Sequence, residues 1–301
     1  MNDLTHLTTG TLDVPGATLY YEQRGSGPVL LLIPGAGADA GLYKAVTRSL
    51  TDRYTVVSFD PRSMSRSPLH GPVADQQVAV WSDDAYRLLE LLSPDEPADV
   101  LGCSAGAIVA LDLLARHPGR VRRAVVHEPP LVELLEDPAP HRALFAEVRE
   151  TFRKEGAGPA MARFSEGLGG DRPSEQHAAE LPPEIQEMAP RMYANLPVFL
   201  EHVLCPFTGW SPDVTALRDT AHKLVPAAGR ESREQVALYG PAARLAELTG
   251  SPLAEFPGGH LGVTERPAEF AAHLLAALAR ETRPAAPAAG YAPGTSSSSS
   301  A

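Results

Sequence analysis

Apolar residues alternate between continuous short runs and helical spacings along most of the chain. The runs at 29–34 (VLLLIP), 98–103 (ADVLGC) and 223–229 (KLVPAAG) are nearly all apolar, which predicts strands buried on both faces of a sheet. Elsewhere apolar residues recur every three or four positions, as over 76–92 and 265–280, which predicts amphipathic helices. This alternation of strands and helices predicts an α/β fold, with a mostly parallel central sheet and helices on both faces.

One long segment breaks the alternation. Residues 131–218 lack strand-like runs and are rich in helix formers broken by proline and glycine. We therefore expect a core in two parts, 1–130 and 219–281, separated by a helical cap over the carboxyl edge of the strands, where ligands bind in such sheets. The Pro-, Ala- and Ser-rich residues 282–301 have almost nothing to bury and are expected to form a disordered tail.

The acidic composition narrows the function classes. The 301 residues carry a net charge of −11, which disfavours binding to nucleic acid or to anionic membranes. The two cysteines are too few for a disulfide framework, no apolar run approaches a membrane span, and the first ten residues do not resemble a secretion signal. No H-x-x-x-H or C-x-x-C spacing indicates a metal. We expect a cytoplasmic protein without metal or cofactor.

The pentapeptide GCSAG at 102–106 lies between a predicted strand and a predicted helix. In this context G-x-S-x-G is typical of a nucleophile elbow, a strained turn that presents the Ser104 hydroxyl above the edge of the sheet. Side chains larger than a methyl group at Gly102 or Gly106 are expected to clash with the neighbouring strand and helix. The alternative is a serine that only caps a helix.

A serine hydroxyl needs a base near neutral pH, and the base needs an orienting acid. His260, in FPGGH between the last strand-like run and the last helix, has the expected place in the order Ser, acid, His. Two glutamates are candidates for the acid: Glu128, in HEPP at the end of the strand-like run over 122–129, and Glu231, just after the run at 223–229. Position alone does not separate them.

The glycine-rich turn that follows VLLLIP has two interpretations. It fits the dinucleotide fingerprint G-x-G-x-x-A at Gly35, Gly37 and Ala40, with the acidic Asp60 at the end of the next strand-like run. Two features weigh against a nucleotide. A predicted hairpin precedes the strand, so the strand does not open a βαβ unit, and Asp60 continues into a tight turn.

Next to a nucleophile elbow, the same turn can instead supply part of an oxyanion hole. One backbone N–H of an oxyanion hole comes from the residue after the nucleophile, and the other from the loop after the third strand. We therefore expect Ala105 and Ala36 to be the two donors. His127 and Cys103 are expected to be structural, because an extended strand turns their side chains away from Glu128 and Ser104.

Together these motifs resemble the α/β-hydrolase superfamily and, within it, the zearalenone lactonases, which open a resorcylic macrolactone. The matching stretches are YYEQRGSGP (20–28), the P-x-x-G loop at Pro34, MSRS (64–67), GCSAG, HEPP (127–130) and PGGH (257–260). In those enzymes a glutamate in a similar H-E-x-P context is the catalytic acid. The resemblance therefore implies a triad of Ser104, His260 and Glu128, with Glu231 as the reserve acid.

The resemblance also implies a ligand pocket under the cap. Phe199 occupies the position of a cap tryptophan that packs on the ligand in the lactonases, and Gly35 and Leu261 are the other expected substrate-binding residues. Ser63 stands where the relatives usually carry glycine, which the sequence does not explain.

The predicted activity is hydrolysis of a carboxylic ester or lactone through an acyl-enzyme, most specifically of a zearalenone-type macrolactone and thus the degradation of a mycotoxin. The alternatives are an esterase or lactonase for another secondary metabolite, or a lyase or perhydrolase on the same fold. The expected partner is the small-molecule substrate. Nothing in the sequence requires an oligomer, and a homodimer stays open.

Overall fold

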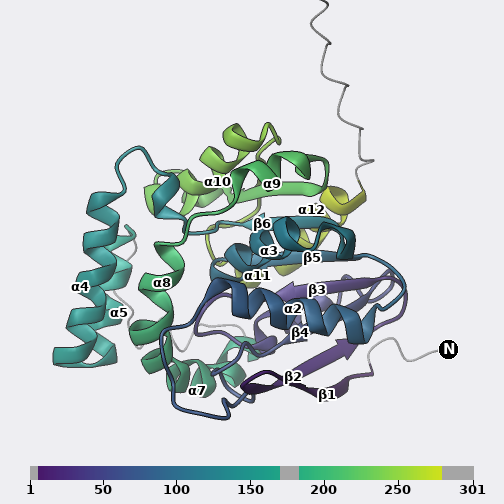
Figure 1. Ribbon diagram of the computed structural model, residues 1–301, viewed down its shortest axis with the longest axis horizontal. Coiled ribbons are helices and arrows are strands. Elements are labelled where there is room, and N and C mark those ends of the chain that lie inside the picture. The colour runs from purple at the N-terminus through teal and green to yellow at the C-terminus, as the bar shows by residue number, and fades with distance from the viewer. Residues whose placement is uncertain (1–5, 170–182, 280–301) are drawn as a thin grey trace, which may run out of the picture.

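The computed structural model describes residues 6–169 and 183–279, so the tail expected over 282–301 lies outside the described residues. Within them one sheet has the strand order β1-β2-β4-β3-β5-β6-β7-β8 (Figure 1). The β1–β2 and β2–β4 pairs are antiparallel, and the remaining pairs are parallel. The strands are β1 (Thr8–Val14), β2 (Ala17–Arg24), β3 (Val29–Ile33), β4 (Thr55–Phe59), β5 (Ala98–Cys103), β6 (Val121–His127), β7 (Leu224–Gly229) and β8 (Ala254–Phe256).

Helices follow almost every parallel strand, as the alternation predicts. The helices of the core are η1 (Ala40–Tyr43), α1 (Lys44–Thr47), α2 (Val78–Leu92), α3 (Ala105–Arg116), η2 (Pro118–Arg120), α9 (Val214–Asp219), η5 (Ala221–Lys223), η6 (Arg230–Ser232), α10 (Val236–Thr249), α11 (Gly262–Glu265) and α12 (Pro267–Ala279). Between β6 and α9 lie η3 (Val132–Leu134), α4 (Ala139–Glu155), α5 (Ala157–Gly167), α7 (Pro183–Val198), the π-helix η4 (Phe199–Val203) and α8 (Leu204–Thr208). We call α4, α5, α7, η4 and α8 the cap helices.

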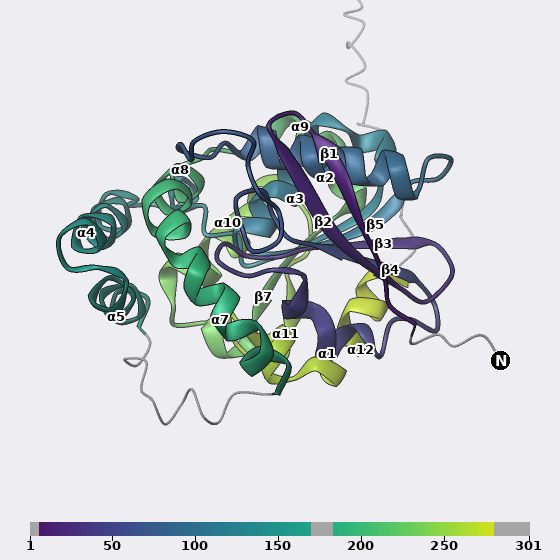
Figure 2. The same cartoon turned by 90° about the horizontal axis from the view of Figure 1, so that it is seen from below.

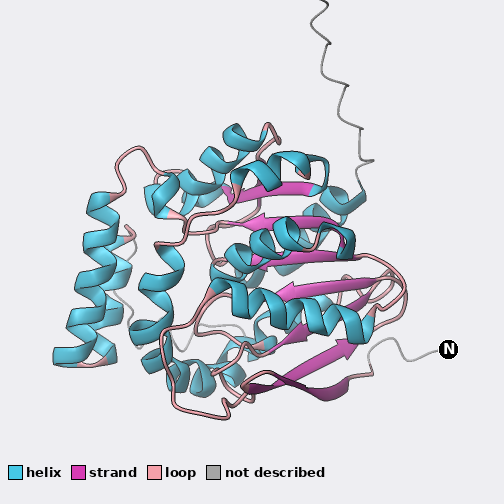
Figure 3. Cartoon of the chain, in the orientation of Figure 1, coloured by secondary structure: helices cyan, strands magenta, loops and turns pink. Residues whose placement is uncertain are grey.

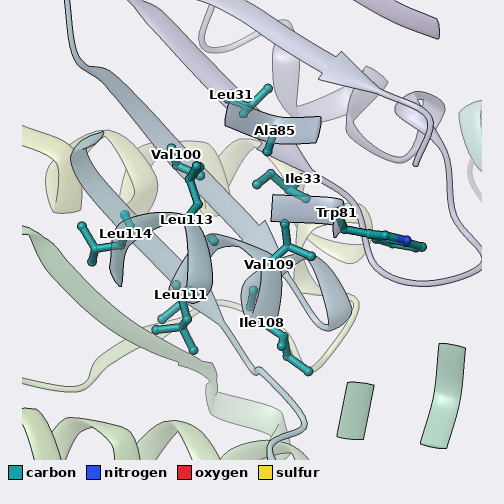
Figure 4. Packing of buried hydrophobic residues seen from close by; sticks show 14 of the residues in the cluster. Leu31, Ile33, Trp81, Ala85, Val100, Ile108, Val109, Leu111, Leu113 and Leu114 are labelled. Atoms are coloured by element: carbon teal, nitrogen blue, oxygen red, sulfur yellow. The ribbon is translucent and has the colours of Figure 1, made fainter. Parts of the chain in front are cut away.

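The apolar run of β3 is buried on both faces of the sheet. Leu31 and Ile33 join a cluster with residues of α2 and α3, among them Trp81 and Val109 (Figure 4). Leu30, on the opposite face, joins a second cluster with residues of α1 and α12. Successive side chains of a strand point to opposite faces, so a continuous apolar run is what a sheet covered by helices on both sides requires.

The cap helices lie beyond the ends to which the central parallel strands point (Figure 3). Helices α4 and α5 pack against each other, and α8 lies between them and the sheet (Figure 2). The predicted end of the cap at residue 218 falls inside α9, which packs on α3 and α10 of the core. No helix in residues 6–169 or 183–279 combines the length and apolarity needed to cross a membrane.

The helix expected over 265–280 is α12, which begins at Pro267, two residues later than expected. The short α11 precedes it, and the chain leaves helical geometry between them at Arg266 (φ −136°, ψ 55°). A proline disfavours helical backbone in the residue before it, which accounts for the break. Pro267 then starts the long helix, as expected of proline in a first turn.

Candidate active site

Ser104 forms the sharp turn between β5 and α3. Its backbone has φ 55° and ψ −123°, which is strained for a residue with a side chain. The Ser104 N–H donates to the His127 carbonyl oxygen at the end of β6 (2.9 Å), which fixes the turn at the carboxyl edge of the sheet. The predicted elbow geometry is therefore present.

The two glycines of GCSAG permit this turn because the backbone passes too close for a Cβ. A Cβ on Gly102 would lie 2.2 Å from the Gly106 carbonyl oxygen, and one on Gly106 would lie 2.1 Å from the carbonyl oxygen of Ile33. The constraint is tighter than the motif predicts, since even a methyl group would clash at either position.

His260 lies in the loop between β8 and α11. Its Nδ1 is 2.7 Å from Oε2 of Glu128, and the other carboxylate oxygen of Glu128 accepts the Gly229 N–H at 2.7 Å. A carboxylate accepts hydrogen bonds only, so Nδ1 carries the proton and Nε2 is left with a lone pair. The loop approaches β7 so closely that a Cβ on Gly229 would lie 2.6 Å from the carbonyl oxygens of Gly258 and Gly259.

Glu128 is fully buried at the end of β6, and its backbone adopts φ 48°. Burial alone would raise the pKa of its carboxyl group. The hydrogen bonds from His260 and from the Gly229 N–H favour the ionised form, outweigh burial and lower the pKa of Glu128 below its ordinary value. The carboxylate thus stays ionised beside the imidazole, as an orienting acid must.

Glu231 occupies a different place. Its carboxylate pairs with Arg266 at 2.8 Å and is largely exposed, while its backbone N–H donates to the Gly258 carbonyl oxygen at 3.1 Å. Glu231 supports the loop that carries His260 through its main chain. The contact between Nδ1 of His260 and the Glu128 carboxylate favours Glu128 over Glu231 as the acid.

The glycine-rich turn lies against the nucleophile. A Cβ on Gly35 would be 3.1 Å from Cβ of Ser104, and the Gly35 carbonyl oxygen accepts the Ala38 N–H at 3.2 Å. Gly37 has φ 80°, as the third residue of a type II turn requires. The Gly35 carbonyl oxygen points into the turn, toward the Ala38 N–H. In the trans peptide bond between Gly35 and Ala36 the N–H points the opposite way, so the Ala36 N–H faces out of the turn. Ala105 begins α3, where its N–H has no acceptor within the helix.

Asp60, the acidic residue that the dinucleotide interpretation requires, already accepts hydrogen bonds from other residues of the protein. Asp60 is fully buried and accepts hydrogen bonds from the Ala40 N–H (3.0 Å) and from the backbone and guanidinium of Arg66 (2.7–3.0 Å). No acceptor on its carboxylate is left facing solvent, so Asp60 organises the loop. Ser63, in the adjacent turn, has φ 65°, a conformation that explains why glycine is common there.

Ser104 and His260 line one cavity of about 560 Å³ between the sheet and the cap helices. The expected residues Gly35, Ala36, Ala105, Phe199 and Leu261 line it too, as does Glu231. The remaining lining is mostly apolar and includes Phe145, Met161, Phe164, Leu196, Leu204 and Phe207. Among the described residues, no group of three or more acidic, His or Cys side chains is arranged to hold a metal.

Phe199 lies at the boundary between the turn and the cap. It starts the π-helix η4, and a Cβ on Gly37 would lie 3.9 Å from its side chain. Its ring meets that of Phe164 edge-on, with centroids 5.8 Å apart. These two aromatic rings line the same cavity as Ser104.

His127 is buried in apolar surroundings, whereas Cys103 is buried but also lines the cavity next to Ser104. Burial raises the pKa of the Cys103 thiol to about 12, so it remains protonated. The buried His127 ring packs edge-on against Phe256 and Phe270, and neither ring nitrogen has a hydrogen-bond partner among the described residues. Burial lowers the pKa of His127 to about 4.

His127→Leu is expected to flatten the acid dependence of stability. The unfolded state binds a proton at His127 near pH 6.5 and the folded state only near pH 4. The free energy of unfolding therefore falls by about 3 kcal/mol as the pH is lowered from 6.5 to 4. Above pH 6.5 and below pH 4 this contribution no longer changes. Urea unfolding of both proteins at steps from pH 7 to pH 4 measures it, and parallel curves would contradict the assignment.

Comparisons with known proteins bear on the family of the chain and on its fold. A family described as having the alpha/beta hydrolase fold matches residues 28–177. The uncharacterised hydrolase YraK of Bacillus subtilis is 35% identical over 283 residues, which cover 92% of this chain and 98% of that protein. A zearalenone hydrolase of Bionectria ochroleuca is 34% identical over 126 residues, 41% of this chain and 48% of that one.

Solved structures share the whole architecture. A hydrolase from Pseudomonas aeruginosa superposes with a TM-score of 0.68 at 20% identity, covering 90% of this chain and 98% of its own. An esterase from Thermogutta terrifontis gives 0.67 at 19% identity, covering 90% and 97%. Fold, elbow and sequence similarity lead to one conclusion: this chain belongs to the α/β-hydrolase family and is a hydrolase.

Proposed function

We propose that the chain is a serine hydrolase that cleaves a carboxylic ester or lactone, with Ser104 as nucleophile, His260 as base and Glu128 as acid. The observation that carries the proposal is the buried Glu128 carboxylate 2.7 Å from Nδ1 of a histidine that shares a cavity with the elbow serine. A protonated Nδ1 leaves Nε2 of His260 free to take the Ser104 proton.

In the first half-reaction Oγ of Ser104 attacks the carbonyl carbon and His260 takes its proton. The N–H groups of Ala36 and Ala105 stabilise the negative oxygen of the tetrahedral intermediate. His260 then protonates the leaving alcohol as the C–O bond breaks. Water, activated by the same imidazole, attacks the acyl-enzyme and releases the acid. With a lactone the alcohol stays attached, so the product is a single hydroxy acid.

The cavity suits a largely apolar, uncharged substrate. About 560 Å³ holds a ligand of drug-like size, and phenylalanine, leucine and methionine side chains dominate the walls. Within the described residues the ionic lining groups are the carboxylates Glu231 and Glu265, and neither lysine nor arginine lines the cavity. An anionic substrate would lack a counter-charge, while the product acid would be repelled and leave.

Among such substrates we favour a zearalenone-type macrolactone. Support comes from the similarity to zearalenone hydrolases, which spans about half of those proteins, and from the ring of Phe199 beside the turn. A flat aromatic lactone can stack on that ring, as on other aromatic side chains.

The test is incubation with zearalenone followed by mass spectrometry of the products. The proposal predicts a product heavier by one water, or its decarboxylated derivative, at a rate that depends on the enzyme concentration. A parallel panel of neutral aryl and alkyl esters, each beside an analogue with a terminal carboxylate, tests the substrate class. Hydrolysis of neutral esters without zearalenone turnover would reject only the macrolactone, and preference for the anionic analogues would reject the class.

A further inference from the structure

One cap side chain reaches the glycine-rich turn beside the nucleophile. Asn195, on α7, is buried, and its Nδ2 donates to the Gly37 carbonyl oxygen (3.0 Å) and to Oγ of Ser65 (2.9 Å). Its Oδ1 accepts the Ser65 N–H at 2.8 Å. All the polar hydrogens of the side chain are therefore used to join α7 to the turn and to the segment after β4.

A second set of bonds holds the residues just after the turn. Asp39 is fully buried and accepts the Gly41 N–H (2.8 Å), the Ser65 hydroxyl (2.9 Å) and Nε of Arg191 (2.5 Å). Arg191 lies one helical turn before Asn195 on α7, so one helix contacts both Gly37 and Asp39. Ser65 has φ 46°, a conformation that its bonds to these two partners stabilise.

The turn itself offers little rigidity. The Ala38–Gly35 hydrogen bond of 3.2 Å closes it, and Gly37 at its centre is free of the Cβ that restricts other residues. An oxyanion hole works only when its donors are held at the position where negative charge develops, so support from outside the turn affects the rate.

We infer that Asn195 is a positioning residue, which holds the turn that carries the Ala36 N–H and so couples docking of the cap helices to catalysis. The inference rests on the proposed function, since the Ala36 N–H matters only if an oxyanion forms there. Asn195 acts through Gly37 and Ser65, and its removal lowers the rate of the chemical step more than the affinity for substrate.

The same helix provides a matched control. Glu184, near the start of α7, pairs with Arg48, the residue after α1, at 2.7 Å, and this ion pair involves no residue of the turn. Glu184→Gln thus removes an attachment of α7 to the core and leaves the support of the turn intact. Asn195→Ala removes the support. Asn195→Asp keeps the shape but replaces the donor Nδ2 by a carboxylate oxygen, which faces the Gly37 carbonyl oxygen and the Ser65 hydroxyl without a hydrogen to donate.

The experiment measures kcat and KM for one neutral ester, together with hydrogen exchange of the amides in 34–41. Both Asn195 variants are expected to lose about 10- to 100-fold in kcat, with KM within about twofold of the wild-type value, and to exchange faster in that segment. Glu184→Gln is expected to match the wild type in all three. If an Asn195 variant does not fold, Ser65→Ala removes the two hydrogen bonds of the Ser65 hydroxyl, to Asn195 and to Asp39, and is expected to lower kcat about fivefold.

Unchanged kcat and unchanged exchange in folded Asn195 variants would overturn the inference, as would an equal loss in Glu184→Gln. The proposed function and the role of Asn195 can be rejected independently of each other. Absence of Ser104-dependent ester hydrolysis in the wild type would reject the proposed function, while hydrogen exchange would still show whether Asn195 holds the turn.

Discussion

Ser104→Ala is expected to lower kcat for an ester substrate by about 10⁵- to 10⁶-fold, with KM little changed. The loss follows from the removal of the attacking oxygen, because the remaining groups cannot form the acyl-enzyme. The fold should survive, since alanine keeps the Cβ and the strained backbone at this position is already adopted by a residue with a side chain. Steady-state kinetics and a thermal melt measure both effects.

The control for Ser104→Ala is Ser165→Ala. Ser165 lines the same cavity but lies on α5 of the cap and not in the elbow. Its loss is expected to leave kcat within about threefold of the wild type, as for a contact that affects binding of the substrate only. Substantial activity in Ser104→Ala, or equal losses in both variants, would mean that another group is the nucleophile.

Glu128→Gln is expected to lower kcat by about 10⁴-fold, the size of effect seen when the acid of such a triad becomes an amide. Glutamine can still accept the Gly229 N–H, so the buried site remains filled. Its NH₂ group would donate to Nδ1 of His260, which places the ring proton on Nε2 and leaves no base toward Ser104. Kinetics at fixed pH, with circular dichroism as a check of folding, measure the effect.

Glu231→Gln is the matched control for Glu128→Gln. It removes the charge that pairs with Arg266 but keeps the backbone bond to the Gly258 carbonyl oxygen. We expect a change of less than about threefold in kcat, because exposed ion pairs contribute little. The opposite ranking of the two variants would assign the role of the acid to Glu231.

Local signals predict the fold and the elbow. Continuous apolar runs such as VLLLI, helical spacings such as 78–92 and the glycines around Ser104 each act over a few residues, so the sequence alone indicates them. The sheet confirms the α/β-hydrolase fold, and the start of the last helix at Pro267 follows from an equally local effect of proline on the residue before it.

The acid could not be assigned from its position in the sequence. Glu128 and Glu231 both follow strands at the same edge of the sheet, and what separates them is the approach of the loop carrying His260, 132 residues after Glu128. The positive φ of Glu128 and the amide of Gly229 are not visible in the sequence either. Resemblance to the lactonases indicated Glu128 where spacing did not.

The role of Asn195 in the cap is even harder to predict from the sequence than the identity of the acid. Asn195 contacts Gly37 across 158 residues, and no motif around it indicates a role. A polar residue expected to be buried on an otherwise apolar helix face would have been the only signal. Such contacts depend on how the cap helices dock, which tertiary packing determines.

Covalent labelling shows whether Ser104 is an activated nucleophile. The native enzyme is treated with a fluorophosphonate, the residual ester hydrolysis is followed, and the modified peptide is identified by mass spectrometry. We expect one phosphonyl group per chain, on Ser104, with activity lost in proportion to labelling and no labelling in Ser104→Ala. Full labelling at another residue, or ester hydrolysis that persists in the fully labelled enzyme, would contradict this expectation.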